Sequence, residues 1–318
     1  MIDRTAIIVG GGPAGASCAQ ALNHAGIDTL ILDKQSFPRP KLCAGWITPR
    51  VWRKLNLNPR SYSGSLTFFD HLHVHIYGRY IPIPTRQYAI RRLEFDHFLL
   101  NRAGVTVEKH RAADIKQENG RYVIDNRFRC TYLIGAGGTG CPVYRTFFRN
   151  ASPRPRSSQI TTLELEFKSS YEDTRCQLWF FEQGLPGYAW YVPKQNGIIN
   201  IGIGAKASPL LSEHRSIQYH WQQFARKIKE ENLIDILPDP PRGHTYFLRH
   251  RVPRLRLGNA FIIGDAAGLA TLDMGEGIGP AVESGQRAAK AVISGGRYHL
   301  RGIPRYSILD ILKHVIKM

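Results

Sequence analysis

The stretch Val9-Gly10-Gly11-Gly12-Pro13-Ala14-Gly15, near the start of the chain, decides the fold. Its first, third and last glycines satisfy the spacing GxGxxG, which permits a tight turn, a close approach to a pyrophosphate, and close packing of a helix on a strand. A helix beginning at Pro13 directs unpaired N–H groups and the positive end of its dipole at a phosphate. The stretch therefore predicts a dinucleotide-binding turn.

A strand, a helix and a second strand surround this turn. We expect the first strand over 5–9, the helix over 13–25, and the second strand over 29–32, ending at Asp33. Asp33 lies about 20 residues beyond the turn, where a carboxylate accepts hydrogen bonds from ribose hydroxyls. This order is the parallel unit of a doubly wound α/β sheet.

A second glycine-rich element lies near the end of the chain, where a predicted strand over 260–264 precedes a predicted helix over 279–293. Asp265 follows the strand, at the edge where ligands bind in open α/β sheets. The N–H groups of the helix are suited to negative charge that develops on a reduced flavin. The residues expected to contact a cofactor here are Gly264, Asp265, Gly275, Gly277 and Ile278.

These two elements together are similar to the FAD-binding motifs of glutathione-reductase-type flavoproteins, in the branch with aromatic hydroxylases and geranylgeranyl reductases. Segments 40–45 (PKLCAG), 92–96 (RLEFD), and 186–194 (PGYAWYVPK) with 200–204 (NIGIG) resemble motifs of the geranylgeranyl reductase family. The resemblance spans residues 5 to 293 and departs from the pattern at Ala44 and Val192, which replace a glycine and an aromatic residue. Gly137 replaces the aspartate of a hydroxylase motif, which argues against a hydroxylase.

The resemblance implies FAD as the cofactor and saturation of isoprenoid double bonds by hydride transfer from N5 of reduced FAD. It implies no metal. The cofactor-binding residues that it implies are Gly10, Gly12, Pro13, Ala14, Gly15, Asp33, Lys34, Lys41, Cys43, Ala44, Gly45, Arg92, Gly264, Asp265, Gly275, Gly277 and Ile278.

Three residues are candidates for a direct part in the reaction. Tyr188 and Trp190 share one face of a predicted strand, where they would wall an apolar channel or belong to an ordinary aromatic core. The Tyr188 hydroxyl is suited to orient a head group or to donate a proton. Cys43 lies in a stretch without acids, which favours a thiolate beside the flavin, although free cysteines are often small buried hydrophobic residues.

The fold class that we predict is α/β, with a doubly wound, Rossmann-like FAD-binding domain and an inserted antiparallel β-sheet substrate domain. Residues 306–318 have helical spacing that suits either an interfacial helix or a packing helix. The predicted boundaries are 1–65, 91–145 and 256–300 for the FAD-binding domain, 66–90 and 146–255 for the substrate domain, and 301–318 for a C-terminal helix.

His71, His73 and His75 alternate along a predicted strand, and we expect a structural or solvent-facing ladder rather than a metal site. The five cysteines are scattered without a CxxC motif, and the N-terminus has no signal-peptide pattern, so we expect a cytoplasmic protein. No apolar run approaches the ~20 residues of a membrane-spanning helix.

The chain carries 43 Lys and Arg against 25 Asp and Glu, a formal net charge of +18. No nucleic-acid recognition motif accompanies this charge, so we expect no specific nucleic-acid partner. A hydrophobic or prenyl lipid substrate with an anionic head group, or peripheral contact with an anionic membrane, explains it better. No second GxGxxG is present, so NAD(P)H would bind transiently as electron donor, or a ferredoxin would serve.

The sequence therefore favours an FAD-dependent oxidoreductase that resembles a geranylgeranyl reductase. One alternative is a flavin-dependent monooxygenase or halogenase of the same fold, although halogenases of this fold carry two tryptophans near the position of the single Trp190. A second alternative is a basic, non-catalytic FAD-binding protein that contacts a membrane or nucleic acid.

Overall fold

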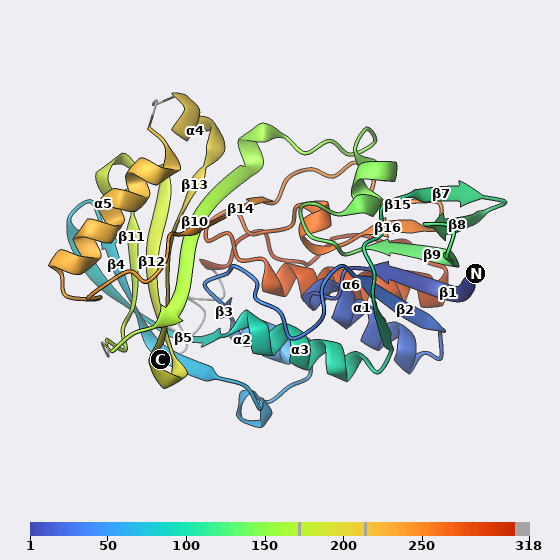
Figure 1. Cartoon of the computed structure of the whole chain (residues 1–318), viewed down its shortest axis with the longest axis horizontal. Coiled ribbons are helices and arrows are strands. Elements are labelled where there is room, and N and C mark those ends of the chain that lie inside the picture. The colour runs from blue at the N-terminus through green and yellow to red at the C-terminus, as the bar shows by residue number, and fades with distance from the viewer. Residues whose placement is uncertain (171–172, 213–214, 309–318) are drawn as a thin grey trace.

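Two β-sheets stand side by side in the computed structural model, which describes residues 1–170, 173–212 and 215–308 (Figure 1). Sheet A has the strand order β15-β16-β9-β1-β2-β6, with β7 and β8 attached through β9. Its strands are β1 (Ile2–Val9), β2 (Thr29–Asp33), β6 (Thr106–Lys109), β7 (Ile115–Glu118), β8 (Arg121–Ile124), β9 (Phe128–Gly135), β15 (Arg256–Leu257) and β16 (Ala260–Ile262).

Sheet B has the strand order β14-β10-β13-β12-β11-β4-β5-β3. Its strands are β3 (Trp46–Ile47), β4 (Leu66–Ile76), β5 (Arg79–Ile90), β10 (Gln159–Lys168), β11 (Cys176–Phe180), β12 (Gly187–Lys194), β13 (Ile198–Lys206) and β14 (Arg242–Phe247). The helices are α1 (Pro13–His24), α2 (Pro49–Lys54), α3 (Arg92–Ala103), α4 (Ala207–Ser212), α5 (Ile217–Glu230) and α6 (Ile278–Ser294).

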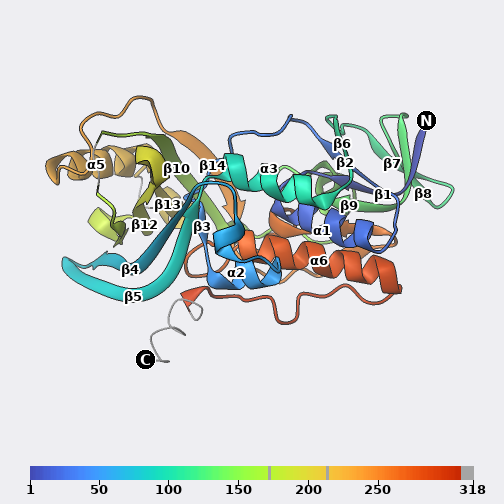
Figure 2. The same ribbon diagram turned by 90° about the horizontal axis from the view of Figure 1, so that it is seen from below.

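The core of sheet A is parallel, as the glycine-rich turn predicts. Strand β1 pairs in parallel with β2 and β9, and β16 joins β9 in the same direction. Helices α1, α3 and α6 lie together along one side of this sheet (Figure 2). Small residues permit the close contact of α1 with α6, because a Cβ added at Gly285 would overlap the carbonyl oxygen of Ala14. The predicted fold class is confirmed.

Sheet B presents two different faces. On the outer face, Tyr191 packs with Trp221 and Phe224 of α5. On the inner face, toward sheet A, Trp190 and Val192 form a separate apolar cluster. The strands are antiparallel except for β4 and β11, which run parallel because they enter the sheet from distant segments of the chain rather than through one hairpin. Alternation along β12 therefore separates the helix-covered side from the side that faces sheet A.

Some sequence-based boundaries differ from the structure. The strand expected over 260–264 is β16, which ends at Ile262, because Gly264 has a positive φ (57°) and begins a single helical turn. Strand β14 lies in a basic stretch that directly follows Pro240 and Pro241. The predicted C-terminal helix lies outside the described residues from 309 onward.

We propose that the two domains have the boundaries predicted from the sequence. Every strand of sheet A lies in the segments predicted for the FAD-binding domain, and every strand of sheet B except β3 lies in those predicted for the substrate domain. Within the described part of the chain, no helix is long and apolar enough to cross a membrane.

The substitution Gly15→Ala tests the glycine-rich turn. Its Cβ would collide with the carbonyl oxygen of Gly10, so we expect the free energy of unfolding to fall by about 1–3 kcal/mol and FAD to be lost on purification. Gly140→Ala is the control, because a Cβ there meets no atom within 4 Å. Urea unfolding and flavin content measure both effects, and a Gly15→Ala protein with the stability and flavin content of the unchanged chain would contradict this packing.

Candidate active site

The turn between β1 and α1 offers free backbone donors beside a buried carboxylate. Helix α1 begins at Pro13, with no side-chain cap and no acid in its first turn, so its N–H groups are suited to phosphates. Asp33 accepts hydrogen bonds from the N–H groups of Gly11 (2.8 Å) and Gln35 (2.9 Å). Each carboxylate oxygen retains a further lone pair for a ribose hydroxyl. Lys34 is exposed just beyond β2.

The second glycine-rich element lies at the same end of sheet A. Asp265 occupies a single helical turn (Gly264–Ala267) directly after β16. A Cβ added at Gly277 would lie 3.4 Å from Oδ1 of Asp265, so this carboxylate lies beside the start of α6. Helix α6 begins at Ile278, and Oε1 of Glu276 accepts a hydrogen bond from the N–H of Gly279 in its first turn (2.6 Å). The structure therefore places Asp265 beside the start of α6, where Glu276 already pairs with one of the first N–H groups.

Gly275 links this element to sheet B. It has a positive φ of 62°, and a side chain there would collide with the hydroxyl of Tyr246 on β14. The requirement for glycine is therefore steric as well as conformational.

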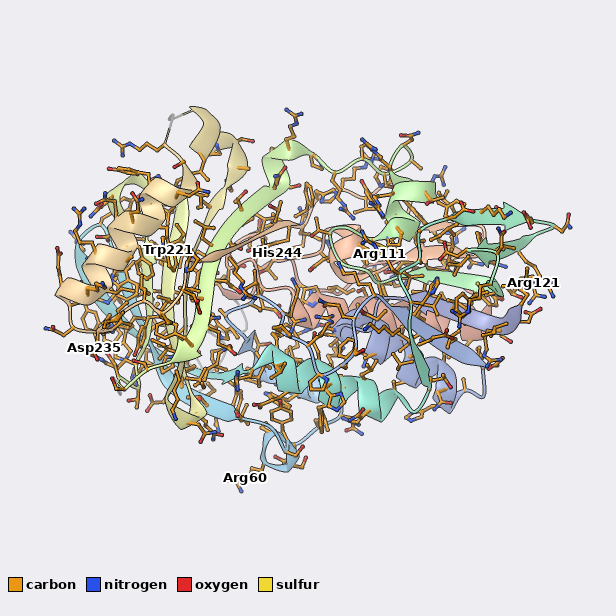
Figure 3. All side chains as sticks on the ribbon, viewed as in Figure 1. Arg60, Arg111, Arg121, Trp221, Asp235 and His244 are labelled. Atoms are coloured by element: carbon orange, nitrogen blue, oxygen red, sulfur yellow. The ribbon has the colours of Figure 1, made fainter. Side chains whose placement is uncertain are left out.

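The segment 40–45 joins sheet A to sheet B. Nζ of Lys41 lies 2.9 Å from Nε2 of His244 on β14, between the two sheets (Figure 3). Burial, with the charge of Lys41, lowers the pKa of His244 to about 4, so the neutral imidazole accepts a hydrogen bond from the ammonium group. Burial and the neighbouring Arg92 also lower the pKa of Lys41. Ala44 packs against the inner apolar cluster of sheet B, and Gly45 donates its N–H to Sγ of Cys43 (3.3 Å).

Arg92 is buried at the first position of α3. It donates two hydrogen bonds to Asp96, at 2.7 and 2.9 Å, and it also contacts the thiol of Cys43. Burial opposes the charged form of Arg92, but the attraction of Asp96 outweighs it and raises the pKa. The predicted cofactor residue Arg92 therefore also anchors the Cys43 segment.

One side-chain amide connects the inner face of sheet B to this segment. Trp190 donates from Nε1 to Oδ1 of Asn200 (2.7 Å), and Asn200 donates from Nδ2 to the carbonyl oxygen of Cys43 (3.3 Å). Tyr188 lies on the same face and donates its hydroxyl proton to the carbonyl oxygen of Met274 (2.5 Å). Burial raises the pKa of Tyr188. The three residues predicted to take part in the reaction therefore lie around one interface between the two sheets.

Glu164 on β10 is a buried carboxylate that sequence reasoning missed. Its residue is 3% exposed, and Oε1 has no hydrogen-bond partner. It lies across from Gly202, whose missing side chain leaves room for the Trp190 ring. Burial raises the pKa of Glu164 to about 7, although Lys194 and Lys41 favour its charged form. Glu164 and Glu166 alternate in Leu-Glu-Leu-Glu, a pattern equally typical of a solvated strand face.

The histidines of β4 contact aromatic side chains. Nδ1 of His73 lies 2.5 Å from the hydroxyl oxygen of Tyr80, and the ring of His75 stacks on that of Trp179 with centroids 5.1 Å apart. The described residues contain no group of three or more His, Cys, Asp or Glu side chains that could hold a metal ion.

Comparison with known families agrees with this geometry. The model of the FAD binding domain family matches residues 3–56 and 98–294, which include both glycine-rich elements. The chain belongs to the FAD binding domain family. The open N-terminus of α1 and the carboxylates Asp33 and Asp265 fit the phosphates and hydroxyls of this cofactor. As a family member with relatives named reductases, the chain is an FAD-dependent oxidoreductase.

Three relatives cover most of the chain. An uncharacterised protein of Methanosarcina barkeri is 30% identical over 91% of this chain and 74% of its own. A menaquinone reductase of Mycolicibacterium smegmatis is 29% identical, over 91% and 76%. Digeranylgeranylglycerophospholipid reductase 3 of Methanosphaera stadtmanae is 27% identical, over 89% and 76%.

Solved structures show the same fold. A geranylgeranyl bacteriochlorophyll reductase-like protein of Thermoplasma acidophilum superposes with a TM-score of 0.79 at 21% identity, covering 100% of this chain and 84% of its own. The flavin-dependent brominase Bmp2 superposes with a TM-score of 0.72 at 19% identity, covering 93% and 81%. Together with the named relatives, these likenesses confirm the resemblance to the geranylgeranyl reductase family.

Glu164→Gln tests the buried carboxylate through pH. Because the pKa rises from its ordinary 4.5 to about 7 on folding, the folded state binds the proton more tightly, and stability falls as pH rises from about 4.5 to about 7. The shift corresponds to about 3 kcal/mol. We expect Glu164→Gln to remove much of this fall in urea unfolding, and the exposed Glu230→Gln to leave it. A Glu164→Gln profile that parallels the unchanged chain would refute the assignment.

Asn200→Leu tests the bridge between the sheets. It leaves the buried N–H of Trp190 unpaired, so we expect a loss of about 1–3 kcal/mol in the free energy of unfolding. Trp190→Phe removes the same donor, and the double variant should then lose less than the sum of the two single losses. Additive losses in a double-mutant cycle would show that the two side chains are not coupled.

Proposed function

We propose that this FAD-dependent oxidoreductase reduces carbon–carbon double bonds of a hydrophobic prenyl lipid. The observation that carries the proposal is the inner face of sheet B, where Tyr188 and Trp190 lie beside the Cys43 segment that follows the cofactor strand β2. An aromatic wall next to a flavin suits an apolar substrate better than a polar one. Relatives named menaquinone reductase and digeranylgeranylglycerophospholipid reductase support the same class of substrate.

We assign the following roles to side chains at the interface between the two sheets. Trp190 and Val192 form the apolar wall and exclude water, and Asn200 fixes the tryptophan ring. Cys43, held by Arg92, lies on the cofactor side of the interface. The Tyr188 hydroxyl is committed to Met274, so we assign it to positioning of the segment before α6.

Saturation of a double bond requires a hydride and a proton. Reduced FAD, when bound, supplies the hydride, and a protein group must supply the proton to the other carbon. We assign the proton to Glu164, because its buried, unpaired Oε1 lies on the Trp190 face and its raised pKa leaves much of it protonated near neutral pH. The electron pair of the double bond then forms one new C–H bond while the hydride forms the other, and Glu164 recovers its proton from solvent.

NAD(P)H, bound transiently, or a ferredoxin would return electrons to the flavin. A flavin-dependent monooxygenase or halogenase is the first alternative, because the brominase Bmp2 has the same fold. Of the three relatives compared above by sequence, two are named reductases and none is named a halogenase. A non-catalytic FAD-binding role is the second alternative.

Anaerobic single turnover tests the proposal. The bound flavin is reduced with dithionite and mixed with menaquinone or with a digeranylgeranylglyceryl phospholipid in detergent micelles. We expect flavin reoxidation and, by mass spectrometry after any quinol has been oxidised back to the quinone in air, a gain of two hydrogens for each carbon–carbon double bond reduced. Glu164→Gln should bind FAD normally but turn over at least about 100-fold more slowly.

Reoxidation that occurs only with oxygen, giving a hydroxylated or halogenated product, would establish the first alternative. No reoxidation by any of these compounds would favour the non-catalytic role.

A further inference from the structure

One end of sheet B carries a group of exposed aromatic side chains. Tyr77 lies at the turn between β4 and β5 and is 78% exposed, and Phe181 follows β11 and is 45% exposed. Their rings stack with centroids 5.6 Å apart. We call Tyr77, Tyr80, Ile81 and Phe181 the aromatic tip. Figure 2 shows the β4–β5 hairpin projecting from the end of the molecule farthest from sheet A.

The backbone at the tip does not favour these residues. Tyr77 and Gly78 have φ angles of 48° and 74° and form a two-residue hairpin loop with the dihedral signs of a type I′ turn. Such a turn prefers Asn-Gly, and a bulky residue in the left-handed region is strained. Phe181 has a φ of 57° and is strained in the same way. Folding alone would place asparagine at both positions, so the aromatic side chains serve another purpose.

A row of aromatic rings connects the tip to the inner face. Phe181 neighbours Phe180, whose ring stacks on Tyr188 with centroids 5.2 Å apart. Tyr188 in turn contacts Trp190 at 5.8 Å. The side chains grow steadily more buried along this row, from Tyr77 at the surface to Trp190, which is 5% exposed. The tip and the proposed reaction face are therefore parts of one continuous apolar surface.

The charges near the tip suit an anionic surface. Arg79 directly follows the turn and is exposed. The acid beside Phe181, Glu182, pairs with Lys227 at 3.1 Å, and Lys227 also pairs with Glu231 at 3.2 Å. A basic residue near an anionic bilayer favours binding, and tyrosine suits the boundary between head groups and acyl chains.

We propose that the aromatic tip docks on an anionic lipid bilayer and that a prenyl chain leaves the bilayer along the Phe181–Phe180–Tyr188 row to reach Trp190. The docking surface stands on the tip itself, and the route for the prenyl chain rests on the proposed function. A bilayer is favoured over a protein partner because the exposed rings continue into an apolar row long enough to guide an extended hydrocarbon chain.

The double variant Tyr77→Asn/Phe181→Asn tests docking with little risk to folding, because asparagine tolerates the left-handed conformation better than either aromatic residue. Its melting temperature should equal or exceed that of the unchanged chain. Ile236→Asn is the matched control, since Ile236 is 73% exposed. Ser170 donates a hydrogen bond to Asp235, the residue before Ile236, and Ser170 lies just beyond Lys168, the end of β10 away from the tip. Ile236 is therefore far from the tip, as the position of Asp235 in Figure 3 shows.

The holoprotein and its variants are sedimented with vesicles of phosphatidylglycerol and phosphatidylcholine. We expect the unchanged chain and Ile236→Asn to bind, and the double variant to bind at least tenfold more weakly. Equal binding by the double variant, or no vesicle binding by the unchanged chain, would overturn the proposal. A dimer of the unchanged chain that the double variant loses, seen by light scattering without vesicle binding, would identify a second copy as the occupant instead.

Turnover separates this proposal from the proposed function. The single variant Tyr77→Asn, which lies outside the route of the prenyl chain, should reduce a prenyl lipid in detergent micelles as fast as the unchanged chain, and the same lipid in vesicles at least tenfold more slowly. Equal rates in vesicles would refute the route. If no prenyl lipid is reduced in either form, the proposed function and the route both fail, whereas docking is still decided by sedimentation.

Discussion

The side-chain amide of Asn200 connects sheet B to the 40–45 segment, which leads from sheet A to sheet B. Its oxygen accepts the indole proton of Trp190, and its nitrogen donates to the backbone of Cys43, so one amide connects the substrate-side sheet to the segment that follows the cofactor strand. Lys41 and His244 make a second connection between the same segment and β14. The Trp190–Asn200 bond is buried and the two contacts to the 40–45 segment are part-buried, so together they connect the wall of sheet B to the edge of sheet A where we expect the cofactor.

Several charged side chains are buried around this interface, and removing them from water lowers the stability of the folded state. Lys194 is almost fully buried and donates to Glu166 at 2.5 Å, and Arg92 pairs with the fully buried Asp96. Glu164 has attraction from Lys194 and Lys41 but no direct partner for Oε1. A buried acid with a raised pKa and an open oxygen is more typical of a reacting group than of a structural one. These features support the proposed role of Glu164 as the proton donor.

Sequence patterns predicted the parts of this structure that depend on local geometry. The GxGxxG spacing identified the turn before α1, and alternation placed Tyr188 and Trp190 on one face of β12. The roles of Glu164 and His244 could not be predicted in the same way, because each depends on partners far away in the chain. His244 lies in a basic stretch without strand periodicity and is 203 residues from Lys41. The same holds for the stack of Tyr77 on Phe181, which only the pairing of β4 with β11 brings together.

The central claim is that a prenyl lipid and the flavin share the interface between the two sheets. The most direct measurement is a titration of the oxidised holoprotein with a prenyl lipid under anaerobic conditions, followed by the visible absorption bands of the flavin. Because no electrons are available, binding is observed without turnover. The account predicts a saturable shift of the flavin bands that is weakened by Trp190→Ala. Saturable lipid binding that leaves the flavin spectrum unchanged would contradict it.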